Sequence, residues 1–268
     1  IMKTKKIAIL GAGNLGEAIA KGIVNGGISK PEHVILTRRN TEKIKHLEAD
    51  GFQISTDNTK AALADIVFLC VQPKQLESLL EEINPILKKG KQVLVSVITG
   101  VDLQTISSQL PKGIPVIRSM PNTAIAIGES MTCLCTNNAS SDQLNEVEAI
   151  YKTLGSTLII EERLMKAATV LGASGIAFFL RYIRAATQGG IELGFDADEA
   201  QKIAMQTARG AASLLIKDGV HPEMEIDKVT TPQGCTIAGL NEMEHQGLSS
   251  ALIKGIKTSY ERINSITK

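Results

Sequence analysis

The chain has 268 residues, of which 43% are hydrophobic and 21% are charged, and its formal net charge is +1. This is ordinary globular composition for one large or two modest domains, and the near-neutral charge argues against a nucleic-acid or anionic-membrane partner. No uninterrupted apolar run approaches the ~20 residues of a membrane span, so we expect a cytoplasmic protein with no membrane partner.

The amino-terminal stretch IMKTKKIAIL begins with basic residues, but its apolar run breaks at Gly11. It is typical of a strand start rather than a secretion signal, and we expect Met2 to be the natural start. The chain has four cysteines, with no Cys-x-x-Cys pair and no histidine nearby, so we expect no metal site. Cys133 and Cys135 alternate within a strand pattern and should share one buried face of a reduced protein.

Up to about residue 160, short apolar β-branched runs alternate with helical patterns. The runs cover 6–10, 33–37, 65–71, 92–97, 115–118, 131–135 and 156–160. Most are continuously apolar, as in strands buried on both faces, and their alternation with helices predicts a parallel sheet with right-handed crossovers.

After residue 163 the strand patterns stop. We predict helices over 163–190, 198–217, 235–246 and 249–266, the first interrupted by Gly172 and Gly175. Alanine and glycine line several helix faces, which favours close packing, including packing against a second copy of the chain. The expected fold class is therefore α/β: a dinucleotide-binding domain over 1–162, then an all-α dimerisation domain over 163–268.

The stretch KIAILGAGNLGEAIAKGI places Gly11, Gly13 and Gly16 directly after a strand and at the start of an amphipathic helix. In this context a Gly-x-Gly-x-x-Gly motif indicates a Rossmann-type dinucleotide site. The first glycine allows the tight turn, the second lets the backbone approach the pyrophosphate, and the third lets the helix close on the strand. The amides at the helix start would face the phosphates.

The end of the second strand reads Thr37-Arg38-Arg39-Asn40, without the acidic residue that holds the ribose 2′-hydroxyl of NAD. Guanidinium groups bind a 2′-phosphate well. We therefore expect NADPH, with NADH as the second option, unless both arginines are ordinary solvated surface residues.

The helical region offers no Lys or His between 171 and 190, where a carbonyl reductase would need a proton donor. It offers Ser174 and Gly175 in an expected small-residue bend. A protonated cyclic imine accepts hydride without a strong acid, so such a substrate fits this site better than a ketone.

Five segments make the whole chain resemble the pyrroline-5-carboxylate reductase family. They are LGAGNLGEAIAKGI, VQPKQL (71–76), RSMPNTAIAIGESMT (118–132), LGASGIAFF and, most specifically, VTTPQGCTIAGL (229–240). The resemblance implies NAD(P)H-dependent reduction of 1-pyrroline-5-carboxylate to L-proline, the last step of proline biosynthesis. It also implies a homodimer through the helical domain, and some family members assemble dimers into decamers.

The resemblance further implies roles for individual residues. The cofactor would be held by Gly11, Ala12, Gly13, Asn14, Leu15, Gly16, Arg38, Arg39, Asn58, Val71, Gln72, Pro73, Lys74, Met120, Pro121 and Asn122. The substrate would be held by Ser174, Gly175, Thr230, Thr231, Gly234, Cys235 and Thr236.

Thr236 is the expected catalytic residue, because its hydroxyl can hydrogen-bond the ring nitrogen; the alternative is that Thr236 only caps a helix. The amides of Gly234, Cys235 and Thr236, at a helix start, would hold the substrate carboxylate. Gln233 stands where the family has a glycine, which matters if the turn needs a positive φ. Such departures leave open a relative that acts on another cyclic imine.

Two other functions remain open at this stage. A β-hydroxyacid dehydrogenase would carry Lys and Asn on the helix after the domain junction; 171–190 lacks both, and Lys166 lies upstream. A non-catalytic NADP-binding regulator would keep the glycine loop and lose the carboxyl-terminal signature, which is present here.

Overall fold

The computed structural model describes residues 5–263; residues 1–4 and 264–268, which include Met2 and the end of the helix expected at 249–266, lie outside the described residues. Contacts divide the chain into two units. The first runs up to Ser174 and resumes at Tyr260, and the second comprises Gly175–Ser259. The domain boundary expected between residues 162 and 163 stays a prediction.

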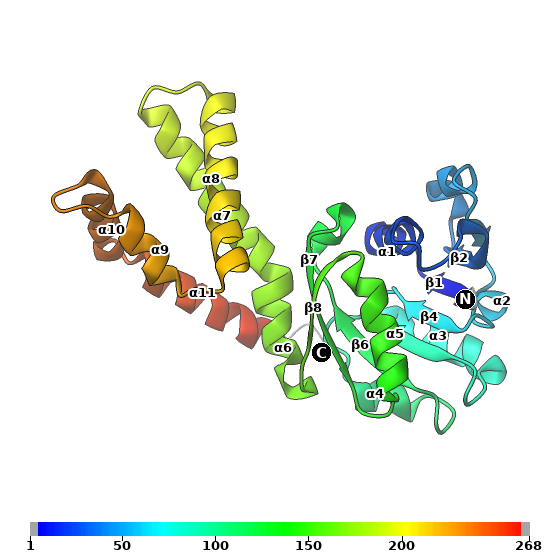
Figure 1. The fold of residues 1–268 in the computed structure, drawn as a ribbon. Coiled ribbons are helices and arrows are strands. Elements are labelled where there is room, and N and C mark those ends of the chain that lie inside the picture. Colours follow the sequence, from blue (N-terminus) through cyan, green and yellow to red (C-terminus); the bar gives the residue numbers. More distant parts are fainter. Residues whose placement is uncertain (1–4, 264–268) are drawn as a thin grey trace. The chain divides into compact units, whose positions relative to one another are not determined.

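The first unit is built on an eight-stranded sheet with the order β3-β2-β1-β4-β5-β6-β7-β8 (Figure 1). The strands are β1 (Ile7–Leu10), β2 (Val34–Thr37), β3 (Gln53–Ser55), β4 (Ile66–Leu69), β5 (Val93–Ser96), β6 (Val116–Met120), β7 (Ser130–Thr136) and β8 (Gly155–Ile159). β1 runs parallel to both β2 and β4, with Ile9 opposite Leu36 and Phe68. The strand order reverses at β1, which creates the crevice where doubly wound sheets bind ligands.

Helices cover both faces of this sheet. On one face, α1 (Asn14–Asn25) and α5 (Ser141–Lys152) pack with Ile7 and Ile9. On the other, α2 (Asn58–Ala61), α3 (Leu76–Ile83) and α4 (Leu103–Ser108) pack with Ala8 and Leu10. Both faces of β1 are buried, which is why its sequence is continuously apolar.

Short 3₁₀ helices complete the connections. They are η1 (Pro31–His33), η2 (Thr41–Lys43), η3 (Lys45–Glu48), η4 (Pro73–Gln75), η5 (Asn84–Ile86), η6 (Thr123–Ile127) and η7 (Glu162–Leu164). Cys133 and Cys135 are both buried in the layer that contains α3 and α4, so the prediction that they share one buried face is confirmed.

The sheet departs from the expected all-parallel arrangement at one pair. β6 and β7 are antiparallel, with Ser119 opposite Leu134. Only η6 lies between these strands, and a parallel return needs a crossover of a dozen or more residues. β3 was also missing from the predicted strands, because its three residues, QIS, are too few and too polar to give a strand pattern.

The first long helix is interrupted where the glycines predicted, but by a π-helical turn rather than a bend. α6 (Met165–Ala168) leads into a π-helical turn at Thr169–Ser174, and α7 (Gly175–Glu192) follows. A π-helical turn holds one more residue per hydrogen-bonded ring than an α-helix, and such turns are frequent at functional sites.

The second unit is helical. It contains α7, α8 (Ala197–Asp218), α9 (Pro222–Val229), α10 (Cys235–His245) and most of α11 (Leu248–Ile263). α7 packs on α8, and a Cβ on Gly190 would lie 2.9 Å from the Cβ of Ala200. The expectation of close packing through small residues is therefore met at this contact. α9 was not predicted, because its sequence PEMEIDKV is short and polar.

The helical stretch Glu162–Glu192 is 31 residues long, and by length and composition alone it could cross a membrane. The expectation that the protein has no membrane partner therefore stays a prediction. Only 17% of its most apolar window is buried, and an interface helix of a soluble oligomer has the same properties. Phe179 on α7 is 71% exposed, and Ile216 on α8 is 84% exposed.

Candidate functional site

The glycine loop between β1 and α1 needs each of its glycines for a different reason. Gly11 has φ +91°, and a Cβ there would lie 2.7 Å from the Cys70 carbonyl oxygen. A Cβ on Gly16 would lie 2.8 Å from Cγ2 of Ile9, so the helix could not close on the strand. A Cβ on Gly13 would meet no atom within 4 Å. The space beside Gly13 is therefore open to a ligand.

Some backbone amides of this loop already donate to carbonyl groups of the protein, and others remain available to a ligand. Gly11 and Ala12 donate to the Thr37 carbonyl, at 3.1 and 2.8 Å, and Gly13 donates to Gly11 at 2.8 Å. The N-cap of α1 is Gly13, which has no side chain to accept from the first helical turn. The amides of Asn14, Leu15 and Gly16 thus remain for an anion, in the favourable field of a helix N-terminus.

The two arginines after β2 have different environments. Arg38 is half-buried, and its Nη1 donates to the Ala12 carbonyl oxygen at 2.9 Å. Arg39 is exposed. Arg38 therefore braces the glycine loop and presents its remaining donors beside it, whereas Arg39 is presented to solvent next to the same strand end.

Asn58, at the start of α2, lies against the end of β2. Its Oδ1 accepts from the Thr37 hydroxyl at 2.6 Å, and its Nδ2 donates to Oε2 of Glu82 at 2.9 Å. Glu82 was not predicted, because a glutamate on the exposed side of α3 belongs to no sequence motif. These two bonds orient the amide that is expected near the adenosine ribose.

Two further loops leave the same carboxyl edge of the sheet. Val71, Gln72, Pro73 and Lys74 follow β4, where Gln72 and Gln75 form a capping box around η4. Val71 approaches the glycine loop so closely that a Cβ on Gly11 would lie 2.7 Å from its Cγ1. Cys70 is the residue before Val71. Burial raises the pKa of its thiol to about 12, so the thiol stays protonated at neutral pH.

Met120 and Pro121 are buried at the end of β6, together with Asn122. Asn122 caps η6 with its side-chain oxygen and also reaches Gly172 in the π-helical turn. The structure thus brings the loops after β1, β2, β4 and β6 to one edge of the first unit, where a dinucleotide would lie across the reversal of strand order.

The signature 229–240 forms a tight turn in the second unit. The Gly234 amide donates to the Thr231 carbonyl at 2.9 Å, and a Cβ on Gly234 would lie 2.4 Å from the Thr231 hydroxyl oxygen. Gln233 has φ +58° and is the one residue other than glycine with a positive φ among residues 5–263. The turn therefore does need the backbone conformation that favours a glycine.

This geometry corrects the expected anion grip in two places. The Gly234 amide is already used inside the turn, so the first available donors of α10 are the amides of Cys235, Thr236 and Ile237. The Thr230 hydroxyl donates to the Ile226 carbonyl at 2.6 Å, so its proton is not available to a carboxylate.

Thr236 is the second residue of α10 and is half-buried. The N-cap of this helix is Gly234, so the alternative that Thr236 caps the helix is wrong. Ser174 closes the π-helical turn and Gly175 opens α7. The nucleotide-loop residues thus belong to the first unit, and the signature residues belong to the second.

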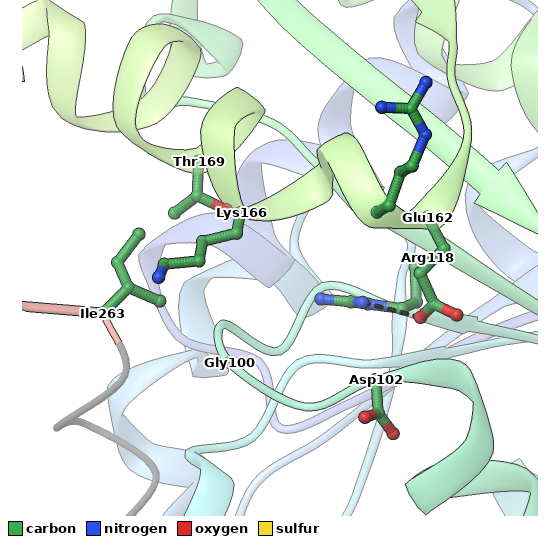
Figure 2. A pocket seen from close by; sticks show the side chains of 8 residues that line it. Gly100, Asp102, Arg118, Glu162, Lys166, Thr169 and Ile263 are labelled. Carbon is green, nitrogen blue, oxygen red and sulfur yellow. Dashed lines mark hydrogen bonds and ion pairs between the residues drawn. The ribbon is translucent and has the colours of Figure 1, made fainter. Parts of the chain in front are cut away.

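The first unit also has a charged cavity of about 400 Å³ that the sequence did not predict (Figure 2). The guanidinium of Arg118 points into it, and Nη1 lies 2.7 Å from Oε1 of Glu162. The same carboxylate oxygen accepts from the Leu103 amide at 2.6 Å. This ion pair connects β6, two residues before Met120, to η7 and to the start of α4. None of the expected site residues lines the cavity.

Comparisons with known proteins agree over the whole chain. A family model described as pyrroline-5-carboxylate reductase dimerisation matches residues 162–266, and one described as NADP oxidoreductase, coenzyme F420-dependent, matches residues 6–100. The chain is 46% identical to pyrroline-5-carboxylate reductase 2 of Dictyostelium discoideum, covering 98% of this chain and 93% of the relative. It is 47% identical to pyrroline-5-carboxylate reductase 1 of the same organism, but spans only 49% of that protein's length.

A solved structure of a pyrroline-5-carboxylate reductase from Coxiella burnetii has a TM-score of 0.93 to this chain. The two are 28% identical, and the match covers 99% of this chain and 100% of the other. The match therefore includes the β-sheet unit and the helical unit alike.

Proposed function

Because the chain belongs to the pyrroline-5-carboxylate reductase family, we propose that it reduces the C=N bond of 1-pyrroline-5-carboxylate to give L-proline, in the last step of proline biosynthesis. The observation that carries this proposal is similarity along nearly the entire chain to relatives of that name. NADPH, when bound, supplies the hydride. The preference for NADPH over NADH is supported by Arg38 and Arg39 at the end of β2.

The residues of the first unit fit such a cofactor. The open space at Gly13 and the available amides of Asn14 to Gly16 suit a pyrophosphate. Arg38, Arg39 and Asn58 lie at the strand ends where the adenosine ribose and its 2′-phosphate would be held. Val71 to Lys74, Met120 and Pro121 flank the same edge and would line the nicotinamide end of the groove.

The second unit would hold the substrate. The amides of Cys235, Thr236 and Ile237 would bind the carboxylate through the positive end of the α10 dipole. The Thr236 hydroxyl would hydrogen-bond the ring nitrogen, which is already protonated in the iminium form and becomes the amine nitrogen. No stronger acid is required, so catalysis is mainly positioning in a site that excludes water.

The oligomer and its location belong to the same proposal. The helical domain, residues 163–268, would join two copies, with assembly of the dimers into a decamer as a further option. The match of 162–266 to a dimerisation family and the exposed apolar side chains of α7 and α8 support the dimer. A second copy that covers these side chains would shield them from water without a membrane. The enzyme would then be cytoplasmic and would have no nucleic-acid partner.

The test is an assay of NADPH oxidation with 1-pyrroline-5-carboxylate, in parallel with the six-membered cyclic imine and with no substrate. We expect rapid turnover with the five-membered imine and slower turnover with the larger ring. Turnover with 3-hydroxyacids and NADP⁺ instead would favour the dehydrogenase alternative. NADPH binding without turnover of any substrate would favour the non-catalytic regulator.

A further inference from the structure

Asn122 is bonded to protein groups at both ends of its side chain. Its Oδ1 accepts from the Ala124 amide at 3.0 Å, and its Nδ2 donates to the Gly172 carbonyl oxygen at 3.1 Å. A backbone N–H can only donate and a carbonyl can only accept, so these partners fix which end of the amide is oxygen. The backbone amide of Asn122 donates to Oγ of Ser130 at 3.1 Å, and Asn122 is only 7% exposed.

The bond from Nδ2 of Asn122 ends at Gly172, inside the π-helical turn Thr169–Ser174. A turn of this kind holds an extra residue compared with an α-helix. An α-helix advances about 100° and 1.5 Å per residue. If the turn relaxed to an α-helix, Ser174 and Gly175 would therefore rotate about the helix axis by about a quarter of a turn or more. The π-helical turn decides which way these two residues face.

We propose that Asn122 is a positioning residue that holds the π-helical turn in register with the loop after β6. The Asn122 side chain caps η6 and also hydrogen-bonds the Gly172 carbonyl. The same side chain therefore positions the loop after β6, which is expected at the nicotinamide, and the residues Ser174 and Gly175, which are expected at the substrate. Asn122 then acts through Gly172 rather than as a direct ligand of the cofactor. The kinetic consequence rests on the proposed function; the structural consequence does not.

The Asn122→Asp variant separates the two bonds. A carboxylate keeps the oxygen that accepts from the Ala124 amide, and Asp is a good N-cap residue. It cannot donate to the Gly172 carbonyl unless it is protonated. Ser130→Ala is the matched control, because it removes the acceptor that the start of β7 offers to the backbone amide of Asn122 and leaves the bond to Gly172 in place.

We expect the Asn122→Asp variant to bind NADPH with a Kd close to that of the wild type. We expect its kcat/KM for the imine to fall by on the order of 10- to 100-fold, with most of the loss in kcat. The ratio of variant to wild-type activity should recover as the pH falls and the carboxyl group gains a proton to donate. Ser130→Ala should change kcat/KM by no more than about 3-fold.

Hydrogen exchange tests the structural part without any assay of activity. Amides of residues 169–175 should exchange faster in the Asn122→Asp variant, while those of 123–127 stay protected, and Ser130→Ala should not show this contrast. If the Asn122→Asp variant does not fold, Asn122→Ser, which keeps a capping oxygen but cannot reach Gly172, carries the same comparison.

Unchanged exchange at 169–175 would overturn the proposal, and so would a rise in the Kd of NADPH that accounts for the whole loss of activity. A wild-type protein that does not reduce the imine would contradict the proposed function instead, and the exchange result would still decide the role of Asn122.

Discussion

At the scale of single residues, Arg38 and Arg39 are adjacent in sequence but differ in what they contact. The bond from Arg38 to the Ala12 carbonyl supports the glycine loop whichever cofactor is bound. Arg39 is exposed beside the same strand end. A charge-assisted hydrogen bond is worth about 1.5–3 kcal/mol, which corresponds to roughly 10- to 100-fold in affinity.

We therefore expect Arg39→Ala to raise KM for NADPH by about 10-fold and to leave KM for NADH unchanged. Arg38→Ala should raise KM for both cofactors, since it also loosens the loop. Steady-state kinetics with each cofactor would check this. A double variant, Arg38→Asp with Arg39→Ala, that kept the wild-type preference for NADPH would contradict the assignment of these residues to the 2′-phosphate.

Thr236 allows a second test at this scale. Thr236→Val keeps the shape of the side chain and removes its hydroxyl, so kcat/KM for the imine should fall by roughly 10- to 100-fold through loss of the proposed bond to the ring nitrogen. Thr236→Ser is the matched control and should retain most of the activity. Wild-type kcat/KM in the Val variant would remove Thr236 from the mechanism.

At the level of secondary-structure elements, two glycines between β1 and α1 have different roles: Gly16 serves folding, and Gly13 is expected to serve cofactor binding. Gly16 is in contact with Ile9 across the helix–strand interface, whereas the space at Gly13 is open. Gly16→Ala should lower the free energy of unfolding by about 1–3 kcal/mol through overpacking. Gly13→Ala should leave it nearly unchanged and raise KM for NADPH instead. Denaturant unfolding and kinetics on both variants would show a stability loss at Gly13 if this distinction were wrong.

The turn before α10 offers another element-scale test. Gln233 is held at φ +58°, where a residue other than glycine is strained by about 1–2 kcal/mol. Gln233→Gly should therefore keep or raise the melting temperature, while Gln233→Val should lower it, because a branched side chain tolerates this φ poorly. Equal melting temperatures for the two variants would argue that the turn relaxes without cost.

For the whole molecule, we expect the apolar side chains exposed on and beside α7 and α8 to decide the state of association. Ile216 on α8 and Leu193, the residue after α7, are each 84% exposed, which is costly for an isolated chain in water. We expect light scattering to give the mass of a dimer or a larger even-numbered assembly, without detergent. Ile216→Glu should shift the mass toward the monomer, and Lys217→Glu, a change on the same helix, is the control for added charge.

A monomeric wild-type protein, or one that is recovered only in detergent, would contradict this prediction. The second outcome would instead favour a membrane contact of the Glu162–Glu192 helix, which is long and apolar enough for one.

Local sequence patterns were enough to predict the α/β class, the positions of most strands along the chain, the glycine loop and the family, because each depends on apolar runs, helical spacing or glycines at fixed offsets. The sequence also indicated that Gln233 would matter if the turn needed a positive φ. These features are set by neighbouring residues in the chain, so they can be recognised without knowing what packs against them.

Which polar groups remain available for a ligand became clear only from the folded chain. The tertiary structure showed that the Gly234 amide and the Thr230 proton are already used, that Asn122 reaches Gly172, and that Glu162 pairs with Arg118. It also decided the antiparallel β6–β7 pair and the π-helical turn. The physical reason is common to all of these. Each depends on partners far apart in sequence or on competition for a single hydrogen bond, and no local pattern records the outcome of that competition.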